Sequence, residues 1–346
     1  DEELVLHYQP KVNMRTGKVL GAEALLRWNH PERGLVPPLE FLPLVEDNDL
    51  AIEIGAWVIG QALRQQSRWL ADGIRIKISI NISGRHLQQN GFAGELEQLL
   101  QSCPEVPAEL IELEVLETTA LGDIGRVSEI IGQCRALGVS VSLDDFGTGY
   151  SSLTYLRRLP ADTLKIDCSF VRDMLADPED LAIVEAIIGL SEAFQRQVIA
   201  EGVETEEHGK LLLRLGCELG QGYGIARPMP AQDLPEWVRA YRQPAGWREI
   251  GHQHWLREDL PLHLAKFNHG ALVDRIIAAL ESGQLTRDEP DLRPTANQFA
   301  DWYKGEGAAR YGALDEFRPV AKAHEALLGL LGEALDGRPD NADAPG

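Results

Sequence analysis

The chain has few basic residues for its length. In 346 residues, 33 lysines and arginines stand against 54 aspartates and glutamates, and the formal net charge is -21. General binding to nucleic acid or anionic membrane depends on a basic surface that attracts phosphate groups. The composition therefore argues against both. A phosphate-bearing ligand would need local help from a metal ion or an arginine.

Cysteine is also scarce. The four cysteines lie far apart and form no CxxC pair: Cys103, Cys134, Cys168 and Cys217. This spacing indicates neither a disulfide framework nor a structural zinc knuckle. We therefore expect buried thiols in a reducing compartment and a cytoplasmic location.

Long apolar runs are missing. No stretch approaches the roughly 20 residues of a transmembrane helix, and the opening segment DEELVLHYQP lacks the layout of a signal peptide. We expect no direct membrane insertion. Because the first residue is not methionine, we also expect the chain to be a fragment with further domains upstream.

Up to about residue 242, strand-like runs rich in Val, Ile and Leu alternate with segments of helical periodicity. Strands are expected at 4–9, 19–26, 76–82, 111–116, 139–143, 163–167, 198–203 and 219–224. Helices are expected at 52–70, 94–100, 124–137, 178–194 and 206–215. This alternation predicts an α/β fold, a (β/α)8 barrel of the TIM type. A short turn at 15–17 replaces the first helix, so the first strand is expected to run antiparallel to the second.

The composition changes after Gln243. Prolines become frequent, two helical runs stand at 269–280 and 320–335, and no good strand follows. We therefore predict a barrel domain over 1–243 and a smaller all-α helical domain over 244–336. The tail 337–346, rich in Gly, Pro, Asp and Asn, is expected to be disordered.

Oxygen-bearing side chains gather at the ends of the predicted strands. They are Glu23, Asn81, Glu114, Asp144, Asp145 and Glu201. A barrel brings these ends together at one face, where buried carboxylates require a cation. Hard divalent ions such as Mg²⁺ and Mn²⁺ prefer such oxygen ligands. The pattern predicts a centre in which Asp144 bridges two ions. For any single residue, the alternative is a helix N-cap or an exposed charge.

Three other residues suggest roles beside such a centre. Lys165 lies in the apolar run TLKID, where an unpaired ammonium is costly to bury. It could hold or deprotonate an attacking water, or form a structural salt bridge. Gln221, between two glycines, could present its amide to substrate or act as a turn residue. Arg27 is a candidate phosphate clamp.

The segment DFGTGYSSL at 145–153 is rich in glycine but matches neither a Walker loop nor GxGxxG, so a nucleotide cradle is excluded. Through Asp145 it could couple ion binding to a dimer contact or a lid. The alternative is an ordinary long barrel loop.

Residues 1 to about 242 resemble an EAL-domain cyclic di-GMP phosphodiesterase. The resemblance rests on YQPKV, GAEALLRWNHPERG, NISGRHL, ELEVLETTAL, DDFGTGYSSL, LKID, AEGVET and QGYGIARPMP. It implies a barrel enzyme of bacterial second-messenger signalling that hydrolyses cyclic di-GMP to linear pGpG with two Mg²⁺ or Mn²⁺ ions. It also implies a homodimer formed through the loop that contains Asp145.

At matching positions, the resemblance implies first-metal ligands at Glu23, Asn81, Glu114 and Asp144, and second-metal or catalytic-water groups at Asp145 and Glu201. Lys165 resembles the general base or water-positioning lysine. Glu117 resembles the glutamate that supports the loop after the fifth predicted strand. Glu204 and Gln221 resemble outer partners of the metals and water.

Substrate contacts are implied at Gln9 and Arg27. Two departures from the family pattern remove no chemistry: Asp49 stands where a glycine is usual, and Gly224-Ile225 where a bulky pair is frequent. The second departure is expected to alter the fit of the substrate.

The C-terminal part resembles a chemoreceptor zinc-binding helical domain, through NHGALVDRIIAALESG, ANQFADWYKGEG and FRPVAKAHEALLGLL. His269 and His324 fall on two ligand positions, but Asn297 and Leu328 occupy the other two. Structural zinc is four-coordinate, so we expect a degenerate bundle without zinc.

The leading interpretation is a metal-dependent cyclic di-GMP phosphodiesterase. The first alternative is a catalytically silent module that binds cyclic di-GMP and signals through the Asp145 loop. The second is an interaction scaffold in which the helical region binds a partner and the barrel is structural. The complete set of ligand-type residues favours the enzyme.

Overall fold

The computed structural model describes residues 3–45, 48–149 and 153–251, and in the C-terminal part 262, 269–270, 273, 276–278, 299–300, 302–315 and 317–336. The chain divides into two units, Asp1–His254 and Trp255–Gly346, and each is described by itself. The predicted tail 337–346 lies outside the described residues.

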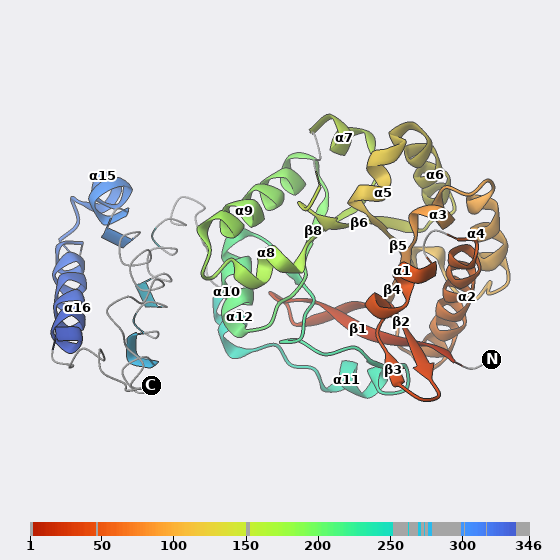
Figure 1. The fold of residues 1–346 in the computed structure, drawn as a ribbon, viewed down its shortest axis with the longest axis horizontal. Coiled ribbons are helices and arrows are strands. Elements are labelled where there is room, and N and C mark those ends of the chain that lie inside the picture. The colour runs from red at the N-terminus through yellow and green to blue at the C-terminus, as the bar shows by residue number, and fades with distance from the viewer. Residues whose placement is uncertain are drawn as a thin grey trace, which may run out of the picture. The chain divides into compact units, whose positions relative to one another are not determined.

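The first unit is built around a closed ring of eight strands (Figure 1). They are β1 (Leu4–Asn13), β2 (Lys18–His30), β4 (Lys77–Ile82), β5 (Ile111–Leu116), β6 (Ser140–Phe146), β7 (Thr163–Ile166), β8 (Gln197–Ala200) and β9 (Leu219–Gly220). Strands β2 to β9 pair in parallel around the ring, whereas β1 closes it antiparallel to both β2 and β9. The predicted barrel and its antiparallel first strand are confirmed.

Two short strands add to the ring. β3 (Gly34–Val36) pairs antiparallel with the end of β2, and β10 (Met229–Pro230) pairs antiparallel with β1. The sequence analysis did not predict them, because two or three residues are too few to show an alternating pattern.

Helices surround the ring (Figure 1). The five predicted helices are present as α2 (Leu50–Ala71), α4 (Phe92–Gln101), α6 (Ile124–Ala136), α9 (Pro178–Ala193) and α10 (Glu206–Leu215). The Asp177 carboxylate caps α9 by accepting the Glu179 amide at 2.8 Å. At the start of α10, Thr205 and His208 form a reciprocal capping box.

Shorter helical segments connect these elements. They are η1 (Pro38–Glu40), α1 (Leu42–Val45), α3 (Gly84–Leu87), η2 (Ala108–Leu110), α5 (Glu117–Gly122), α7 (Leu153–Arg158), α8 (Cys168–Asp173), α11 (Leu234–Ala240) and α12 (Ala245–Gly251). Among the described residues, no helix is both long and apolar enough to cross a bilayer.

Helix α12 packs against α10. Trp247 is buried, and its indole N–H donates to the Glu206 carbonyl at 2.7 Å. Its ring lies so close to Gly209 that a Cβ there would approach within 2.3 Å. Helix α12 therefore belongs to the barrel unit, although the predicted domain boundary at 243 lies before it. The first unit ends after this helix, at His254.

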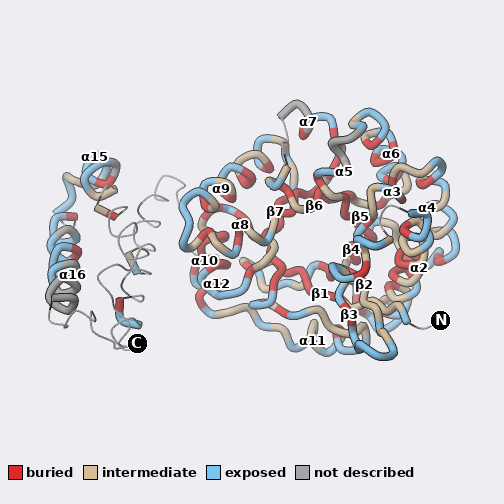
Figure 2. Tube along the Cα trace, in the orientation of Figure 1, coloured by how far each residue is buried: buried red, intermediate tan, exposed pale blue. Residues whose placement is uncertain are grey.

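Residues along the strands of the ring are largely buried (Figure 2), and successive side chains point to opposite sides of the sheet. In β4, Ile78 and Ile80 are buried, and Ser79 between them points the other way. The Ser79 hydroxyl contacts Lys11 of β1, a strand that is not a neighbour of β4 in the ring. Apolar side chains therefore face the helices, and polar ones fill the ring.

In the second unit, the described residues include η4 (Tyr303–Gly307), α15 (Ala308–Tyr311) and α16 (Arg318–Asp336). The helix predicted at 269–280 falls partly outside the described residues, and its described positions are helical. His269 and His324 lie with Nδ1 atoms 3.3 Å apart, and the Phe299 ring contacts both. The predicted lack of zinc stays a prediction.

Candidate active site

The predicted metal ligands form two groups in the barrel. The carboxylate oxygens of Glu23, Glu114 and Asp144 lie within 4.8 Å of one another, and so do those of Asp144, Asp145 and Glu201. Glu23 lies in the middle of β2, next to Ala24, where the parallel pairing with β4 ends. Glu114, Asp144 and Asp145 come from the last residues of β5 and β6, and Glu201 follows β8. Asp144 belongs to both groups. The arrangement can accommodate two cations that share one carboxylate.

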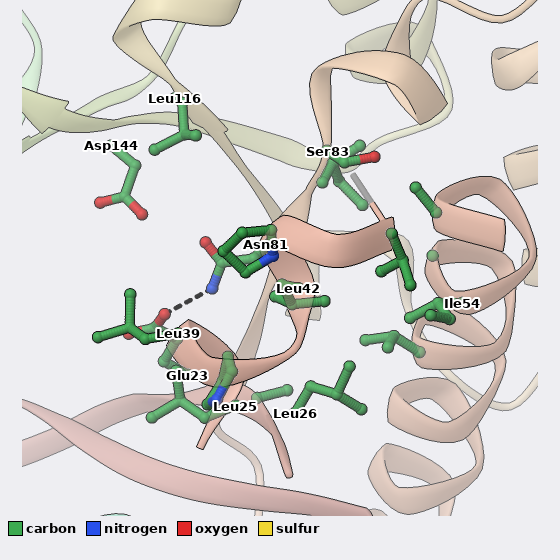
Figure 3. A pocket seen from close by; sticks show the side chains of 18 of the residues that line it. Glu23, Leu25, Leu26, Leu39, Leu42, Ile54, Asn81, Ser83, Leu116 and Asp144 are labelled. Carbon is green, nitrogen blue, oxygen red and sulfur yellow. Dashed lines mark hydrogen bonds between the residues drawn. The ribbon is translucent and has the colours of Figure 1, made fainter. Parts of the chain in front are cut away.

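The first group is shielded from solvent. Glu114 is 1% exposed and Glu23 and Asp144 are each 7% exposed, so they are not the surface charges that the alternative interpretation requires. The Asn81 amide donates to Glu23 Oε1 at 2.6 Å, which places its side chain at the edge of this group (Figure 3). Figure 3 shows Glu23, Asn81 and Asp144 arriving from three strands at one end of a cavity.

Lys165 lies between the two groups. It is 1% exposed. Its Nζ lies 2.6 Å from Glu114 Oε2, 2.8 Å from Asp144 Oδ1 and 2.7 Å from Glu201 Oε1. Although burial would lower it, these carboxylates raise the pKa of Lys165 well above its usual value. Lys165 thus forms the structural salt bridges that one interpretation predicts. It also lies between the two carboxylate groups, where a residue that acts on the attacking water would be needed.

The carboxylates of the two groups destabilise one another's charge. Burial, followed by repulsion from Glu114, raises the pKa of Glu23. Burial also raises the pKa of Glu201 well above its usual value. Burial, the Asp144 charge and a hydrogen bond to Asp167 raise the pKa of Asp145 to about 7. Such strong shifts in one cluster are typical of functional sites.

The same cluster suits hard divalent ions. The two groups contain five carboxylates, and four of them lie within 4 Å of the Lys165 ammonium, which leaves an excess of negative charge in a buried place. The buried Oε1 of Gln221, beside this cluster, has no hydrogen-bond partner among the described residues. Carboxylate and amide oxygens are the ligands that Mg²⁺ and Mn²⁺ prefer. The residues present therefore fit a divalent metal.

The backbone turns sharply at the end of β6. Asp145 has φ of 52°, a left-handed conformation that is rare for residues other than glycine and concentrates at functional sites. This turn lets two consecutive aspartates serve the same cluster, although neighbours in a strand point to opposite faces.

Glu117 acts on the loop that follows. Its buried carboxylate accepts the Gly147 amide at 2.8 Å, and Gly147 is itself left-handed with φ of 106°. Glu117 thus ties the start of α5 to the segment after Asp145. Residues 150–152 of the predicted loop lie outside the described residues.

Gln221 and Gln9 link the cluster to β1. The Gln221 amide donates to Glu23 Oε2 at 2.5 Å and to Gln9 Oε1 at 3.0 Å. The Gln9 amide in turn donates to the Ala226 carbonyl at 2.9 Å. Arg27 is half-buried, which lowers its pKa, and donates to the Leu26 carbonyl at 2.8 Å.

Glu204 lies apart from the two groups. It is exposed, and its carboxylate belongs to neither. Its carbonyl oxygen closely approaches Gly224, where a Cβ would come within 2.4 Å. A side chain at 224 would therefore require the backbone at Glu204 to shift.

Lys11 is a functional candidate that was not predicted from the sequence. This buried lysine of β1 contacts Glu114 Oε1, Ser79 Oγ at 2.7 Å and Glu112 Oε2 at 3.4 Å. The signal that singled out Lys165, a lysine inside a strand-like run, was also present in YQPKV and could have identified Lys11.

A cavity of about 450 Å³ opens beside the metal-ligand groups. Glu23, Asn81, Asp144 and Asp145 line one end of it, and leucines of η1 and α1, together with apolar residues of α2, line the rest (Figure 3). An apolar wall beside a few polar groups is typical of a site for an organic ligand.

Fold and site together define a barrel protein with a carboxylate centre at the ends of its parallel strands, the usual position of the active site in this architecture. The EAL domain family matches residues 1–228. The chain belongs to that family.

Two curated relatives illustrate the similarity. The bifunctional diguanylate cyclase/cyclic di-GMP phosphodiesterase MucR of Pseudomonas aeruginosa is 46% identical over 233 residues, which cover 67% of this chain and 34% of MucR. The cyclic di-GMP phosphodiesterase PdeR of Escherichia coli is 40% identical over 250 residues, covering 71% of this chain and 37% of PdeR. The chain thus spans little more than a third of these relatives.

The chain is also similar to solved structures of EAL domains. A complex of the P. aeruginosa MucR phosphodiesterase with c-di-GMP has a TM-score of 0.65 and 45% identity, and covers 67% of this chain and 94% of that one. The EAL domain of FimX from P. aeruginosa, bound to c-di-GMP, has a TM-score of 0.60 and 26% identity, and covers 66% and 91%.

Proposed function

We propose that the barrel hydrolyses cyclic di-GMP to linear pGpG in bacterial second-messenger signalling. The observation that carries this proposal is the pair of carboxylate groups that share Asp144. Support also comes from the relatives, which are named as cyclic di-GMP phosphodiesterases.

Two Mg²⁺ or Mn²⁺ ions complete the proposed centre. Glu23, Asn81, Glu114 and Asp144 would hold the first, and Asp144, Asp145 and Glu201 the second. When bound, such a pair activates water at neutral pH and stabilises charge on the attacking and leaving oxygens of an in-line displacement.

The protein's own residues supply the remaining steps. Lys165, which already contacts Asp144 and Glu201, orients the attacking water. Of the two roles predicted for it, the general base is disfavoured, because its raised pKa keeps it an ammonium that has no lone pair for the proton. Gln221 and Gln9 present amides from the β1 side, and Arg27 neutralises a phosphate of the ligand. The apolar wall of the cavity excludes water around the bases. Glu117 holds the Asp145 loop, and Glu204 acts from outside the centre.

A product assay tests the proposal. The full chain is incubated with cyclic di-GMP and Mg²⁺, and in parallel with Mn²⁺, and the products are separated by chromatography. We expect linear pGpG that disappears with a chelator. Folded, metal-loaded protein that leaves the cyclic ligand intact contradicts the proposal.

A silent binding module is the main alternative, and the FimX EAL domain shows that a relative of this fold binds c-di-GMP. Asp144→Ala distinguishes the two. Because Asp144 belongs to both carboxylate groups, this change should abolish product formation. If the unaltered protein binds cyclic di-GMP in a calorimeter without turnover, the silent module is correct; if it does not bind at all, the scaffold is favoured.

We also propose a cytoplasmic homodimer. Four free thiols favour a reducing compartment; Cys103, Cys134 and Cys217 are buried as predicted, whereas Cys168 is exposed, contrary to the prediction. The proposed contact is the loop that follows Asp145, and light scattering of the full chain gives the oligomeric state. A monomer at all concentrations contradicts the dimer without touching the activity.

A further inference from the structure

A second buried lysine stands beneath the carboxylate centre. Lys11 of β1 is 6% exposed and points into the ring. Its ammonium donates to Ser79 Oγ at 2.7 Å and to Glu112 Oε2 at 3.4 Å, and it makes a short contact with Glu114 Oε1. The Ser79 hydroxyl also donates to Glu112 Oε2 at 2.7 Å, so the group is internally bonded.

This arrangement divides the two oxygens of Glu114 between different partners. Oε1 contacts Lys11, whereas Oε2 lies 2.6 Å from Lys165, whose ammonium also contacts Asp144 and Glu201. Among the described residues, the ion pairs of Lys11 are with Glu112 and Glu114. Lys11 thus contacts the centre through one atom of one predicted ligand.

We propose that Lys11 is a positioning residue of the metal centre, which holds Glu114 Oε1 and so presents Oε2 to a divalent cation. The inference rests on the metal-dependent part of the proposed function. A carboxylate held at one oxygen cannot rotate away from its ion, and partners that orient metal ligands in this way strongly affect metal affinity.

The direction in which metal affinity changes when Lys11 is removed shows whether Lys11 acts by positioning Glu114 or only by its charge. A nearby ammonium repels a cation, so if Lys11 contributed only its charge, its removal would tighten metal binding. If Lys11 positions Glu114, its removal weakens metal binding.

Mn²⁺ titration of the metal-free full chain, followed by electron paramagnetic resonance of the free ion, measures this direction. We expect Lys11→Met to weaken Mn²⁺ binding by about 10- to 100-fold. Ser79→Ala removes one contact that holds the Lys11 ammonium and should weaken binding less, in the same direction. Lys77→Met is the control, because Lys77 lies on β4 with Ser79, bonds Ser140 Oγ at 2.8 Å and reaches Glu112 Oε1 only at 3.9 Å, without contacting Glu114. It should leave the affinity unchanged.

The Mn²⁺ affinities of these variants decide whether Lys11 positions Glu114. Unchanged or tighter Mn²⁺ binding by folded Lys11→Met overturns the inference but not the proposed function. If that variant does not fold, the comparison of Ser79→Ala with Lys77→Met takes its place, and equal affinities overturn the inference. No Mn²⁺ binding by the unaltered chain overturns both.

Discussion

Buried charge organises the centre at the scale of residues. Two lysines, Lys11 and Lys165, are buried among carboxylates, and Glu114 contacts both. Removing one partner of a buried ion pair is strongly destabilising, because it leaves a charge without compensation. A buried lysine can therefore be structural and catalytic at once, and only a change in rate separates these roles.

The Lys165→Met variant, assayed at saturating Mn²⁺, tests whether Lys165 has a catalytic role besides its structural one. If the Lys165 ammonium orients the attacking water, kcat for linear product should fall by about 100-fold, the loss expected when a reacting group is misplaced. Chromatographic rates give kcat, and circular dichroism checks the fold. An unchanged kcat in folded protein would leave only the salt-bridge interpretation of this residue.

At the scale of elements, strand ends and the loops after them assemble the site. β6 ends at Phe146, with Asp145 in a left-handed turn, and Glu117 of α5 holds the following Gly147 amide. The contact joins two loops of the barrel that follow adjacent strands. By fixing this loop, Glu117 can position Asp145 without itself being a metal ligand.

Glu117→Gln keeps the shape of the side chain and removes its charge. The Gly147 hydrogen bond weakens, and because bonds to charged groups contribute about 1.5–3 kcal/mol, we expect hydrolysis to slow by roughly tenfold or more. The Mn²⁺ affinity of the first group should not change. Glu109→Gln, on an exposed ion pair with Arg75, is the matched control. Equal rates in the two variants would remove the role assigned to Glu117.

At the scale of the whole molecule, the net charge of -21 and the crowded carboxylates both favour cation binding. A cation that binds the folded barrel and not the unfolded chain stabilises it by mass action. The acidic balance is thus compatible with an anionic ligand only if metal ions reduce the repulsion at the site.

Mn²⁺ should therefore raise the thermal midpoint of unfolding. At 100 times the dissociation constant, the gain is about 2.7 kcal/mol for one site. Scanning calorimetry measures the shift, and a chelator should reverse it. Asp144→Asn should lose most of the shift, since both groups include Asp144. An equal shift in that variant would place the stabilising ion elsewhere.

The sequence by itself determined the barrel, its antiparallel strand and the set of residues at its strand ends. Alternating periodicities mark strands and helices locally, and a parallel barrel necessarily brings its strand ends to one face. The eight strands and five helices could be predicted from local patterns alone. The short β3 and β10 could not, because they are strands only through their pairing with β2 and β1.

Tertiary structure alone decided which charges meet. Nothing local to YQPKV shows that Lys11 reaches Glu112 and Glu114, about a hundred residues away in sequence. Nor does local sequence show that Glu204, which follows β8 as Glu201 does, is exposed and belongs to neither carboxylate group. These outcomes depend on distances across a closed ring, which form only when all its strands have paired.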